Sequence, residues 1–439
     1  MISKIKCTLK DPALTGTLIV SMGVFLGSIF SYLLQIGLGH LLSIEDFGLF
    51  NAFLSLSVIF GIPAGAVSVS LVKKVAEHLA RNDFKTLRTL FWSLSKSSLG
   101  FGICLSLLFV IFKSEIAAYL NIPQNGVIFM FAVFLALSFI NVAPLAYLQG
   151  LLRFKAYAFL SFISQLLRLV IPLGLVYAGF AVKGAYAGLI LVGLLSYGVA
   201  ILLLNKNLKM GVDPENNRMD EYIRAIYRKL LIFSIPVLFI NSGVAILNNL
   251  DIVMVKHFFS PYEAGVYAGV VTICKVFLFG ASIVQIVMFP QISHLYAANA
   301  NYKKRFFKFL ALQLLLIFGG LFVFSTLPSL INQLMFGGKF ADSVPYLPLF
   351  ALFTAFYILL TFLSMFLLAI NKTKAYLIIL PAVLLQYLAI SAWHTNLFSI
   401  IRINIISAGV ACLLIVMYVV KSLHESVGNC PHLQTGKNH

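Results

Sequence analysis

Long apolar runs recur along almost the whole sequence, and they constrain the fold more than any other feature. An apolar run of about 18 residues is long enough to cross the hydrocarbon core of a bilayer as an α-helix. Only 10% of the residues are charged, too few to cover the surface of a soluble protein. We therefore predict an all-α polytopic membrane protein with about 12 transmembrane helices. Their expected bounds are residues 14–42, 47–72, 87–112, 126–148, 157–180, 185–204, 230–257, 264–289, 306–328, 345–370, 376–393 and 398–420.

One long polar segment, residues 205–229, interrupts this series of apolar runs. It predicts a linker between an N-terminal lobe at 1–204 and a C-terminal lobe at 230–420, each of six helices, with a tail at 421–439. The first apolar run follows three lysines, as in a signal peptide. It is too long for a signal peptide and lacks a small-residue cleavage site, so we expect it to remain as the first helix.

The basic residues are distributed unevenly between the two sides of the predicted helices. If the N-terminus is cytoplasmic, 24 of the 32 Lys and Arg residues fall in cytoplasmic segments and 5 in extracytoplasmic ones. Membrane proteins carry this excess of Lys and Arg on the cytoplasmic side. Both termini and the linker at 205–229 are therefore predicted to be cytoplasmic. The net charge of +18 has the same origin and does not indicate a nucleic-acid partner.

Two short segments repeat one pattern 217 residues apart. LLSIEDFGLF begins at Leu41 and FFSPYEAGVY begins at Phe258, each between two apolar runs. The same spacing places Arg88 on Arg305, each at the start of the third helix of its half. We infer an internal duplication in which both halves enter the membrane in the same orientation. Parallel repeats of this kind are a transporter architecture, with the substrate site between the repeats near the membrane midplane.

Six stretches carry a resemblance to a known family, and in chain order they are LLSIEDFGLFNAF, LVKKVAEHLARND, YLQGLLRFKAYA, LDIVMVKHFFSPYEAGVYAGV, VMFPQIS and LMFGGKFADSVPYLPLFAL. With them the chain resembles the Wzx-type polysaccharide flippases (polysaccharide biosynthesis protein family) of the multidrug/oligosaccharidyl-lipid/polysaccharide exporter superfamily. The resemblance implies a two-lobed, V-shaped bundle that moves an undecaprenyl-pyrophosphate-linked oligosaccharide across the bacterial cytoplasmic (inner) membrane. It also implies membrane lipids, a coupling cation or proton, and polysaccharide polymerases and glycosyltransferases as partners. The glycan's destination stays open between O-antigen, capsule and exopolysaccharide.

Arg168, in the fifth predicted span, is the strongest candidate for binding such a substrate. A pyrophosphate needs cations in a wet cavity, and ionisable residues inside spans usually face one. Ser161, Ser164 and Gln165 precede Arg168 on the same helix face, which makes one polar stripe on an apolar helix. The structural alternative is an arginine that caps backbone carbonyls at a kink near Pro172.

Two further cations lie inside predicted spans. Lys275 occupies the eighth span at the depth of Arg168, with Ser282 and Gln285 further along the helix. It is a second candidate for substrate binding, and an interhelical hydrogen bond is its structural alternative. Lys96 lies nearer the cytoplasmic end of the third span. It is a weaker candidate, because its side chain can reach the lipid headgroups from there.

The first helix of each half carries polar residues at heptad spacing. Asn241 and Asn248 lie in the seventh span, and Gln35 ends a similar series in the first span. Such residues line a cavity or hydrogen-bond between packed helices, and both interpretations stay open. Asp251 is the only acidic residue in a predicted span. It is our candidate for binding a coupling proton or cation, and pairing with Lys256 is the alternative.

Catalytic signatures are missing from the sequence. It contains no HExxH, Walker-type or catalytic-triad pattern in a suitable setting, and its five cysteines are scattered without CxxC pairs. We expect no enzyme activity, no cofactor and no metal site. Two alternatives remain: a multidrug or other cation exporter of the same superfamily, and a membrane-embedded glycan polymerase or acyltransferase. The exporter needs an acidic cavity, yet three basic residues and one acidic residue are counted as intramembrane once those near the span ends are assigned to either side.

Overall fold

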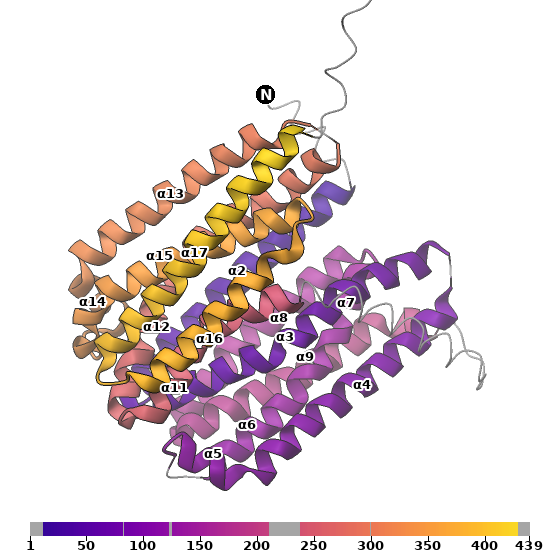
Figure 1. Cartoon of the computed structure of the whole chain (residues 1–439). Helices are drawn as coiled ribbons and strands as arrows, with labels where there is room; N and C mark the ends of the chain where they lie inside the picture. The colour runs from indigo at the N-terminus through magenta and orange to yellow at the C-terminus, as the bar shows by residue number, and fades with distance from the viewer. Residues whose placement is uncertain (1–11, 82, 123–124, 210–237, 299, 429–439) are drawn as a thin grey trace, which may run out of the picture. The chain divides into compact units, whose positions relative to one another are not determined.

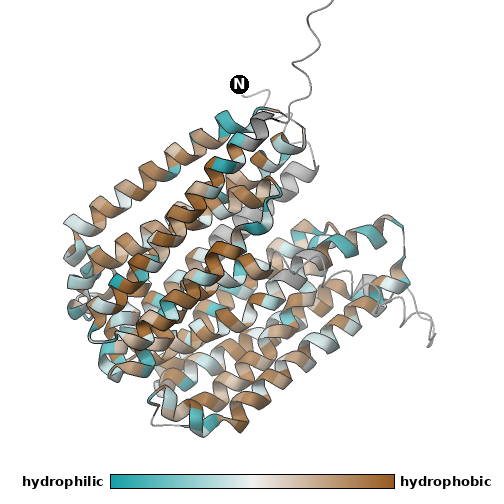
Figure 2. Cartoon of the chain, in the orientation of Figure 1, coloured by the Kyte–Doolittle hydropathy of each residue, from teal (hydrophilic) through white to brown (hydrophobic). Residues whose placement is uncertain are grey.

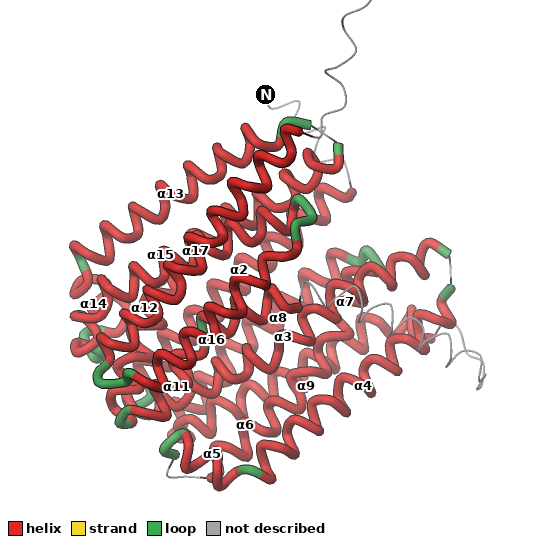
Figure 3. The backbone as a smooth tube through the Cα atoms, viewed as in Figure 1, coloured by secondary structure: helices red, strands yellow, loops and turns green. Residues whose placement is uncertain are grey.

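The structure is a computed structural model, and it describes residues 12–81, 83–122, 125–209, 238–298 and 300–428. Within these ranges the chain consists of helices joined by short turns, and no β-strand occurs in them (Figure 3). The chain divides into two compact units. The first is Met1–Leu238 with Phe259–Gly265, and the second is Phe239–Phe258 with Val266–His439. The all-α fold is confirmed, and most of the predicted linker at 205–229 lies outside the described residues.

The first unit contains the elements α2 (Pro12–Leu41), α3 (Ile44–Ala80), α4 (Phe84–Ile111), α5 (Lys113–Tyr119), α6 (Asn125–Ser138), η1 (Phe139–Asn141), α7 (Val142–Gly150), α8 (Phe154–Leu175), η2 (Val176–Phe180) and α9 (Ala181–Lys209) (Figure 1). Helix α8 packs against both α2 and α9, α4 packs against α6, and α3 packs against α7. The chain reverses between α8 and α9 at Gly179, whose φ of 93° is a conformation that glycine adopts without strain.

The second unit contains the helix Leu238–Leu247 and the elements α11 (Leu250–Phe258), α12 (Pro261–Ala297), α13 (Tyr302–Thr326), α14 (Pro328–Phe336), η3 (Ala341–Tyr346), α15 (Leu347–Ala369), η4 (Thr373–Ala375), α16 (Tyr376–Ala392) and α17 (Leu397–Gly428) (Figure 1). The first residues of two of these helices, Leu238 and Pro261–Gly265, are counted with the first unit. Helix α15 packs against both α13 and α17, and α16 packs against α17. Most of α15 is buried, so it forms the centre of this unit.

Each of the twelve predicted spans corresponds to helix in the structure, the seventh over its described residues 238–257. Nine stretches of the described residues are long and apolar enough to cross a membrane, or ten if the bent pair Leu238–Leu247 and Leu250–Phe258 counts as one span. One of these stretches, Phe154–Asn205, holds two predicted spans, and α2 corresponds to the first predicted span. Hydrophobic residues predominate along the helices of both units (Figure 2), and many large ones are exposed. The protein is therefore a multi-pass membrane protein.

The internal duplication is visible in the helices themselves. Helices α3 and α12 both have 37 residues, and their bounds differ by the 217-residue spacing of the sequence repeat. Each begins with the same cap, because the hydroxyls of Ser43 and Ser260 accept hydrogen bonds from the backbone N–H of Asp46 (3.1 Å) and Glu263 (3.3 Å). Such a cap satisfies N–H groups that a helix leaves unpaired at its start. The repeated serine therefore forms the same N-terminal cap at the start of both helices, with the backbone N–H of the repeated acidic residue as its donor.

Candidate functional site

A helix break in the second unit is the starting point of the candidate site. The helix Leu238–Leu247 ends, two residues form a turn, and α11 begins at Leu250 after a bend of 41°. The last carbonyls of a helix have no partner within the helix. Here the carbonyl of Leu247 accepts a hydrogen bond from Nε2 of Gln386 on α16 (3.1 Å). The side chain of Gln386, from another helix, therefore satisfies a carbonyl at the C-terminal end of Leu238–Leu247.

Asp251 lies directly after this break, in the first turn of α11, and its side chain is fully buried (0% exposed). Its Oδ1 accepts a hydrogen bond from the backbone N–H of Ile252 (2.8 Å). Its Oδ2 accepts one from Tyr267 Oη on α12 (2.6 Å) and one from Asn404 Nδ2 on α17 (2.8 Å). An ionised carboxylate only accepts hydrogen bonds, so these three donors match the charged form. Within the described ranges, Asp251 forms no ion pair with Lys256 or any other residue.

The amides of Asn404 and Gln386 extend this contact into a network across four helices. Asn404 Nδ2 also lies 3.0 Å from Tyr267 Oη, and Gln386 Nε2 donates to Asn404 Oδ1 (2.9 Å). Gln386 Oε1 is buried and has no hydrogen-bond partner among the residues described by the structure. Leaving such an oxygen unpaired costs about 1–3 kcal/mol. The cluster therefore holds a buried acid and a spare acceptor, as a site for a small positive species requires.

The geometry suits a proton more directly than a metal ion. Tyr267 Oη and Asn404 Nδ2 both donate to Oδ2 of Asp251. A metal ion bound to this oxygen would have to displace these two donor groups. In the described part of the chain, no three His, Cys, Asp or Glu side chains come together as metal ligands do. A proton needs only one oxygen of the carboxylate. When it binds there, that oxygen stops accepting from one of its donors, and the network rearranges.

Lys275 lies on α12, eight residues after Tyr267, and is half-buried. It interacts electrostatically with Asp251. It makes no hydrogen bond or ion pair with the side chains that the structure describes. An ammonium group inside a spanning helix is costly, and the charge of Asp251 offsets part of that cost.

Arg168 belongs to the first unit and lies on α8, where its side chain is half-buried. Its Nε is buried and has no hydrogen-bond partner within the described residues. One turn earlier, Gln165 faces α2, where Ser31 Oγ donates to its Oε1 (3.4 Å). A Cβ on Gly27 would lie 2.9 Å from Gln165 Nε2, so glycine makes room for the amide. Gln165 therefore packs between two helices, whereas Arg168 keeps an unused donor.

The remaining predicted site residues do not join these groups in the structure. Gln35 lies on α2 and is buried, and its Oε1 has no partner among the described residues. Ser161, Asn241 and Asn248 are half-buried, and Asn248 lies in the break before Asp251. Lys96 is exposed on α4.

Sequence reasoning missed three members of the buried network, namely Tyr267, Gln386 and Asn404. Gln386 and Asn404 are isolated amides among apolar residues, in the eleventh and twelfth predicted spans. Their signal in the sequence is that an amide within a span requires a hydrogen-bond partner in hydrocarbon. Tyr267 carries a weaker signal, since it only ends the repeated string FFSPYEAGVY, at the position that Phe50 has in LLSIEDFGLF.

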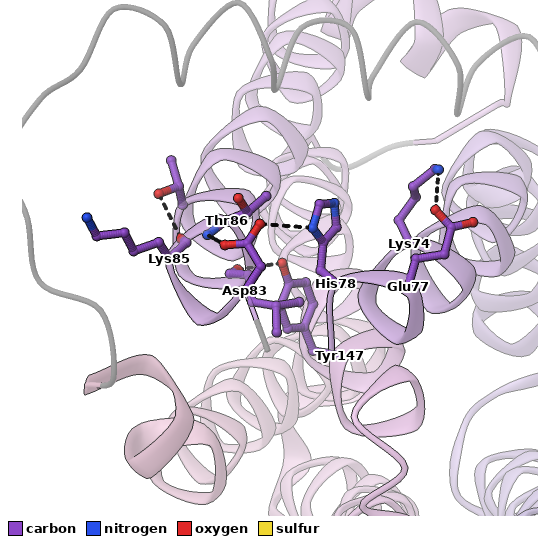
Figure 4. A network of polar contacts seen from close by, with 9 residues as sticks. Lys74, Glu77, His78, Asp83, Lys85, Thr86 and Tyr147 are labelled. Atoms are coloured by element: carbon purple, nitrogen blue, oxygen red, sulfur yellow. Dashed lines mark hydrogen bonds and ion pairs between the residues drawn. The ribbon is translucent and has the colours of Figure 1, made fainter. Parts of the chain in front are cut away.

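A second polar network connects α3 and α4, where the turn residue Asp83 precedes the spanning stretch Phe84–Ile111 (Figure 4). Asp83 Oδ1 accepts from the backbone N–H of Thr86 (3.1 Å) and caps α4, while its Oδ2 lies 3.2 Å from Nδ1 of the buried His78. Nearby, Tyr147 Oη donates to the carbonyl of Leu87 (2.7 Å). Asp83 caps the start of α4 and contacts the end of α3, and Tyr147 joins α7 to α4, so these contacts hold helices together.

The comparisons with known proteins agree on family and fold. Residues 38–345 match the family described as Polysaccharide biosynthesis protein. The inward-facing conformation of a multidrug resistance MATE family transporter of the MOP superfamily matches with a TM-score of 0.70 at 13% identity, covering 92% of this chain and 98% of that one. The lipid II flippase MurJ, in an inward closed conformation, matches with a TM-score of 0.67 at 13% identity, covering 92% of this chain and 87% of MurJ. A eukaryotic MATE transporter matches with a TM-score of 0.65 at 16% identity, covering 93% and 96%. No curated protein matched by sequence.

Proposed function

Because the chain belongs to the polysaccharide biosynthesis protein family, we propose that it is a flippase for an undecaprenyl-pyrophosphate-linked oligosaccharide. It moves this lipid across the bacterial inner membrane by alternating access, with both termini in the cytoplasm. The observation that carries the proposal is the family match over residues 38–345, on a fold that is also found in a lipid II flippase and in MATE transporters. Glycosyltransferases would supply the substrate, and a polymerase would use it for O-antigen, capsule or exopolysaccharide.

The charges inside the spanning helices support an anionic substrate. Arg168 keeps a buried Nε without a hydrogen-bond partner among the described residues, and Lys275 makes no hydrogen bond or short ion pair there although the charge of Asp251 acts on it; each lies well inside a span. A pyrophosphate offers the acceptors that a guanidinium and an ammonium need in a low-dielectric setting. We assign both residues to the pyrophosphate. Side chains assigned to the lining of the path are Gln35, Lys96, Ser161, Gln165, Asn241 and Asn248.

Asp251 is the proposed coupling group. In its charged form it holds Tyr267 and Asn404 by hydrogen bonds, and through Asn404 it holds Gln386, which binds the broken end at Leu247. A proton, or a small cation in its place, removes one of these contacts and loosens the connection to the break. Binding that favours one arrangement of a two-state element shifts its population. An ion gradient can bias transport by this route.

The direct test uses the purified chain in proteoliposomes with a fluorescent polyprenyl-pyrophosphate oligosaccharide. We expect the glycan to cross the bilayer unchanged, and a proton gradient to accelerate its movement in wild type but not in Asp251→Asn. Failure of the wild-type protein to move the lipid would refute the proposal.

The two alternatives give different results in the same vesicles. A multidrug exporter, the description of one protein of similar fold, would move a cationic dye and leave the lipid-linked glycan in place. A glycan polymerase or acyltransferase would change the glycan covalently, as a shift in its mass. Either result would replace the flippase proposal.

A further inference from the structure

The short helix α14 follows the membrane-spanning α13 after a break at Leu327. It lies at the end of α13 opposite the basic cluster Lys303–Lys308, so the charge distribution places it on the extracytoplasmic side. In Figure 1 it occupies the end of α13. Two glycines with positive φ, Gly337 and Gly338, follow it and lead the chain into η3. Nothing in the proposed transport mechanism uses this helix.

The surface of α14 is divided into three sectors. Asn332, Met335 and Phe336 are buried against the second unit. Leu327, Leu330 and Leu334 are exposed (47%, 47% and 77%). At about 100° per residue, Leu330 and Leu334 fall within an arc of roughly 40°, and Leu327 is the residue that caps the start of the helix. Ser329 and Gln333 are also exposed, and they lie together on the adjacent arc, between the leucines and the buried face.

We propose that α14 lies in the plane of the membrane at the extracytoplasmic interface. Its three leucines enter the boundary of the lipid acyl chains, and Ser329 and Gln333 face the headgroups and water. A helix inside the hydrocarbon would expose only apolar side chains, and a helix in water would not expose leucines on one arc. Only the interface provides an apolar and a polar medium side by side.

The lipid bilayer is the occupant because the exposed leucines continue a lipid-facing surface. The preceding α13 exposes Leu315, Phe318 and Phe322 (68%, 66% and 69%), which is expected of a helix in contact with acyl chains. The leucines of α14 begin five residues after Phe322. A protein partner seated on them would also have to displace lipid from the end of α13.

The first unit provides a contrast. There α5 follows α4, as α14 follows α13, but α5 has seven residues and buries none of them. It exposes Lys113 and Glu115 together with Tyr119. None of its residues is fully buried, and its exposed side chains do not separate into an apolar and a polar sector, so we assign the interfacial position to α14 alone.

Tryptophan quenching by brominated phosphatidylcholine tests the proposal on the full chain in vesicles. The two native tryptophans are first replaced (Trp92→Phe and Trp393→Phe), and single tryptophans are then introduced by Leu330→Trp, Leu334→Trp and Gln333→Trp. The reference deeper in the bilayer is Leu315→Trp, about 18 Å along α13 from Leu327. An interfacial helix buries its apolar face about 5–10 Å into the boundary. We expect bromines near the headgroup to quench positions 330 and 334 about twofold or more above position 333, and bromines near the chain end to quench only position 315 strongly.

Three results would overturn the proposal. Equal quenching at positions 333 and 334 would mean that the helix is not sectored by the membrane. Absence of quenching at both 330 and 334 would place the leucines in water or under a protein. Strong quenching of position 334 by the deepest bromines would place α14 inside the hydrocarbon. Each substituted side chain is exposed, so we expect every variant to fold. Positions 330 and 334 give two independent measurements of quenching.

Discussion

At the same place in the repeat, the two units carry different chemistry. Shifting Asp251 and Tyr267 back by 217 residues gives Leu34 and Phe50, both buried in the first unit. There the hydroxyl of Tyr186 donates to the backbone carbonyl of Phe50 (3.0 Å), whereas Tyr267 donates to the carboxylate of Asp251 (2.6 Å). Helix α2 is also continuous at the positions where its counterpart in the second unit breaks.

The difference shows how one scaffold can serve two purposes. A backbone carbonyl does not change its charge, so the contact of Tyr186 is permanent. A carboxylate can take up a proton, and its hydrogen bonds then change. At this place, therefore, the first unit has a contact with a backbone carbonyl, and the second unit has a titratable carboxyl beside a helix break. The following experiments test this contrast.

The largest effect is expected when Asp251 is changed to the residue of the first unit. Asp251→Leu leaves the donors of Tyr267 and Asn404 without an acceptor, at about 1–3 kcal/mol each. We expect a lower thermal unfolding temperature and loss of gradient-driven transport in proteoliposomes. Asp251→Asn has nearly the same shape and should keep the fold, with transport reduced on the order of tenfold, because an ion with no differential affinity shifts no equilibrium. Normal coupling in well-folded Asp251→Asn would remove Asp251 from the mechanism.

The next effect concerns Arg168, the cation of the first unit with an unused donor. Losing a hydrogen bond to a charged group costs about 1.5–3 kcal/mol, so Arg168→Ala should reduce glycan export roughly tenfold or more while membrane abundance stays near wild type. Arg168→Lys should be milder, since it keeps the positive charge. It should still reduce export, since an ammonium cannot reproduce the planar fork of a guanidinium. Lys275→Ala should resemble Arg168→Ala. The control is Lys113→Ala at a helix end, for which we expect no effect.

Export must be compared with protein abundance in the Arg168 variants. Loss of export in proportion to loss of protein would make Arg168 a structural residue. Normal export by an abundant Arg168→Ala protein would remove it from the substrate site.

A smaller effect distinguishes the two tyrosines. Tyr267→Phe removes a hydrogen bond to a charged acceptor, worth about 1.5–3 kcal/mol, and Tyr186→Phe removes one to a neutral carbonyl, worth about 0.5–1.5 kcal/mol. Thermal unfolding should therefore show the greater loss for Tyr267→Phe. Only this variant should also change the pH dependence of transport. An equal change in both variants would show that the carboxylate contact is no different from the backbone contact.

The smallest effect compares the caps of α4 and α13, where Asp83 and Asn301 both accept from a backbone N–H. Partial burial raises the pKa of the Asp83 carboxyl, but hydrogen bonds from Thr86 and His78 outweigh it and lower the pKa below its ordinary value. The resulting stabilisation is present above the unfolded pKa of about 3.9 and is lost as the pH falls through the lower folded pKa.

The variant Asp83→Asn keeps a good cap, as Asn301 does, and removes this titration. We expect nearly unchanged stability at pH 7 and a weaker loss of stability in acid, measured by thermal unfolding between pH 7 and pH 3. The same acid sensitivity in wild type and Asp83→Asn would assign it to other groups.

The spans and the repeat could be predicted because their causes are local or evenly spaced. A segment in hydrocarbon must satisfy its own backbone, so each helix is written in a continuous apolar run. The shared cap of Ser43 and Ser260 was likewise visible as a repeated string. The break before Asp251 was not predicted, because Asn248 and Asn249 are compatible with either a helix or a turn.

The candidate site was predicted in part. Asp251, Lys275 and Arg168 were identified because a charge inside a span is rare and costly. Their contacts could not be predicted, because the partners depend on how each helix is rotated against its neighbours. The donor that holds Asp251 from α17 lies 153 residues further along the chain.

By itself, therefore, the sequence determined that this protein crosses a membrane many times in two similar halves, since the length and apolarity of each run decide whether it can span. Only the tertiary structure decided that an aspartate, a tyrosine, an asparagine and a glutamine of the second half meet in one buried network. In hydrocarbon all four polar side chains require hydrogen-bond partners, but this requirement does not determine which residues those partners are. The packing of α11, α12, α16 and α17 determines them.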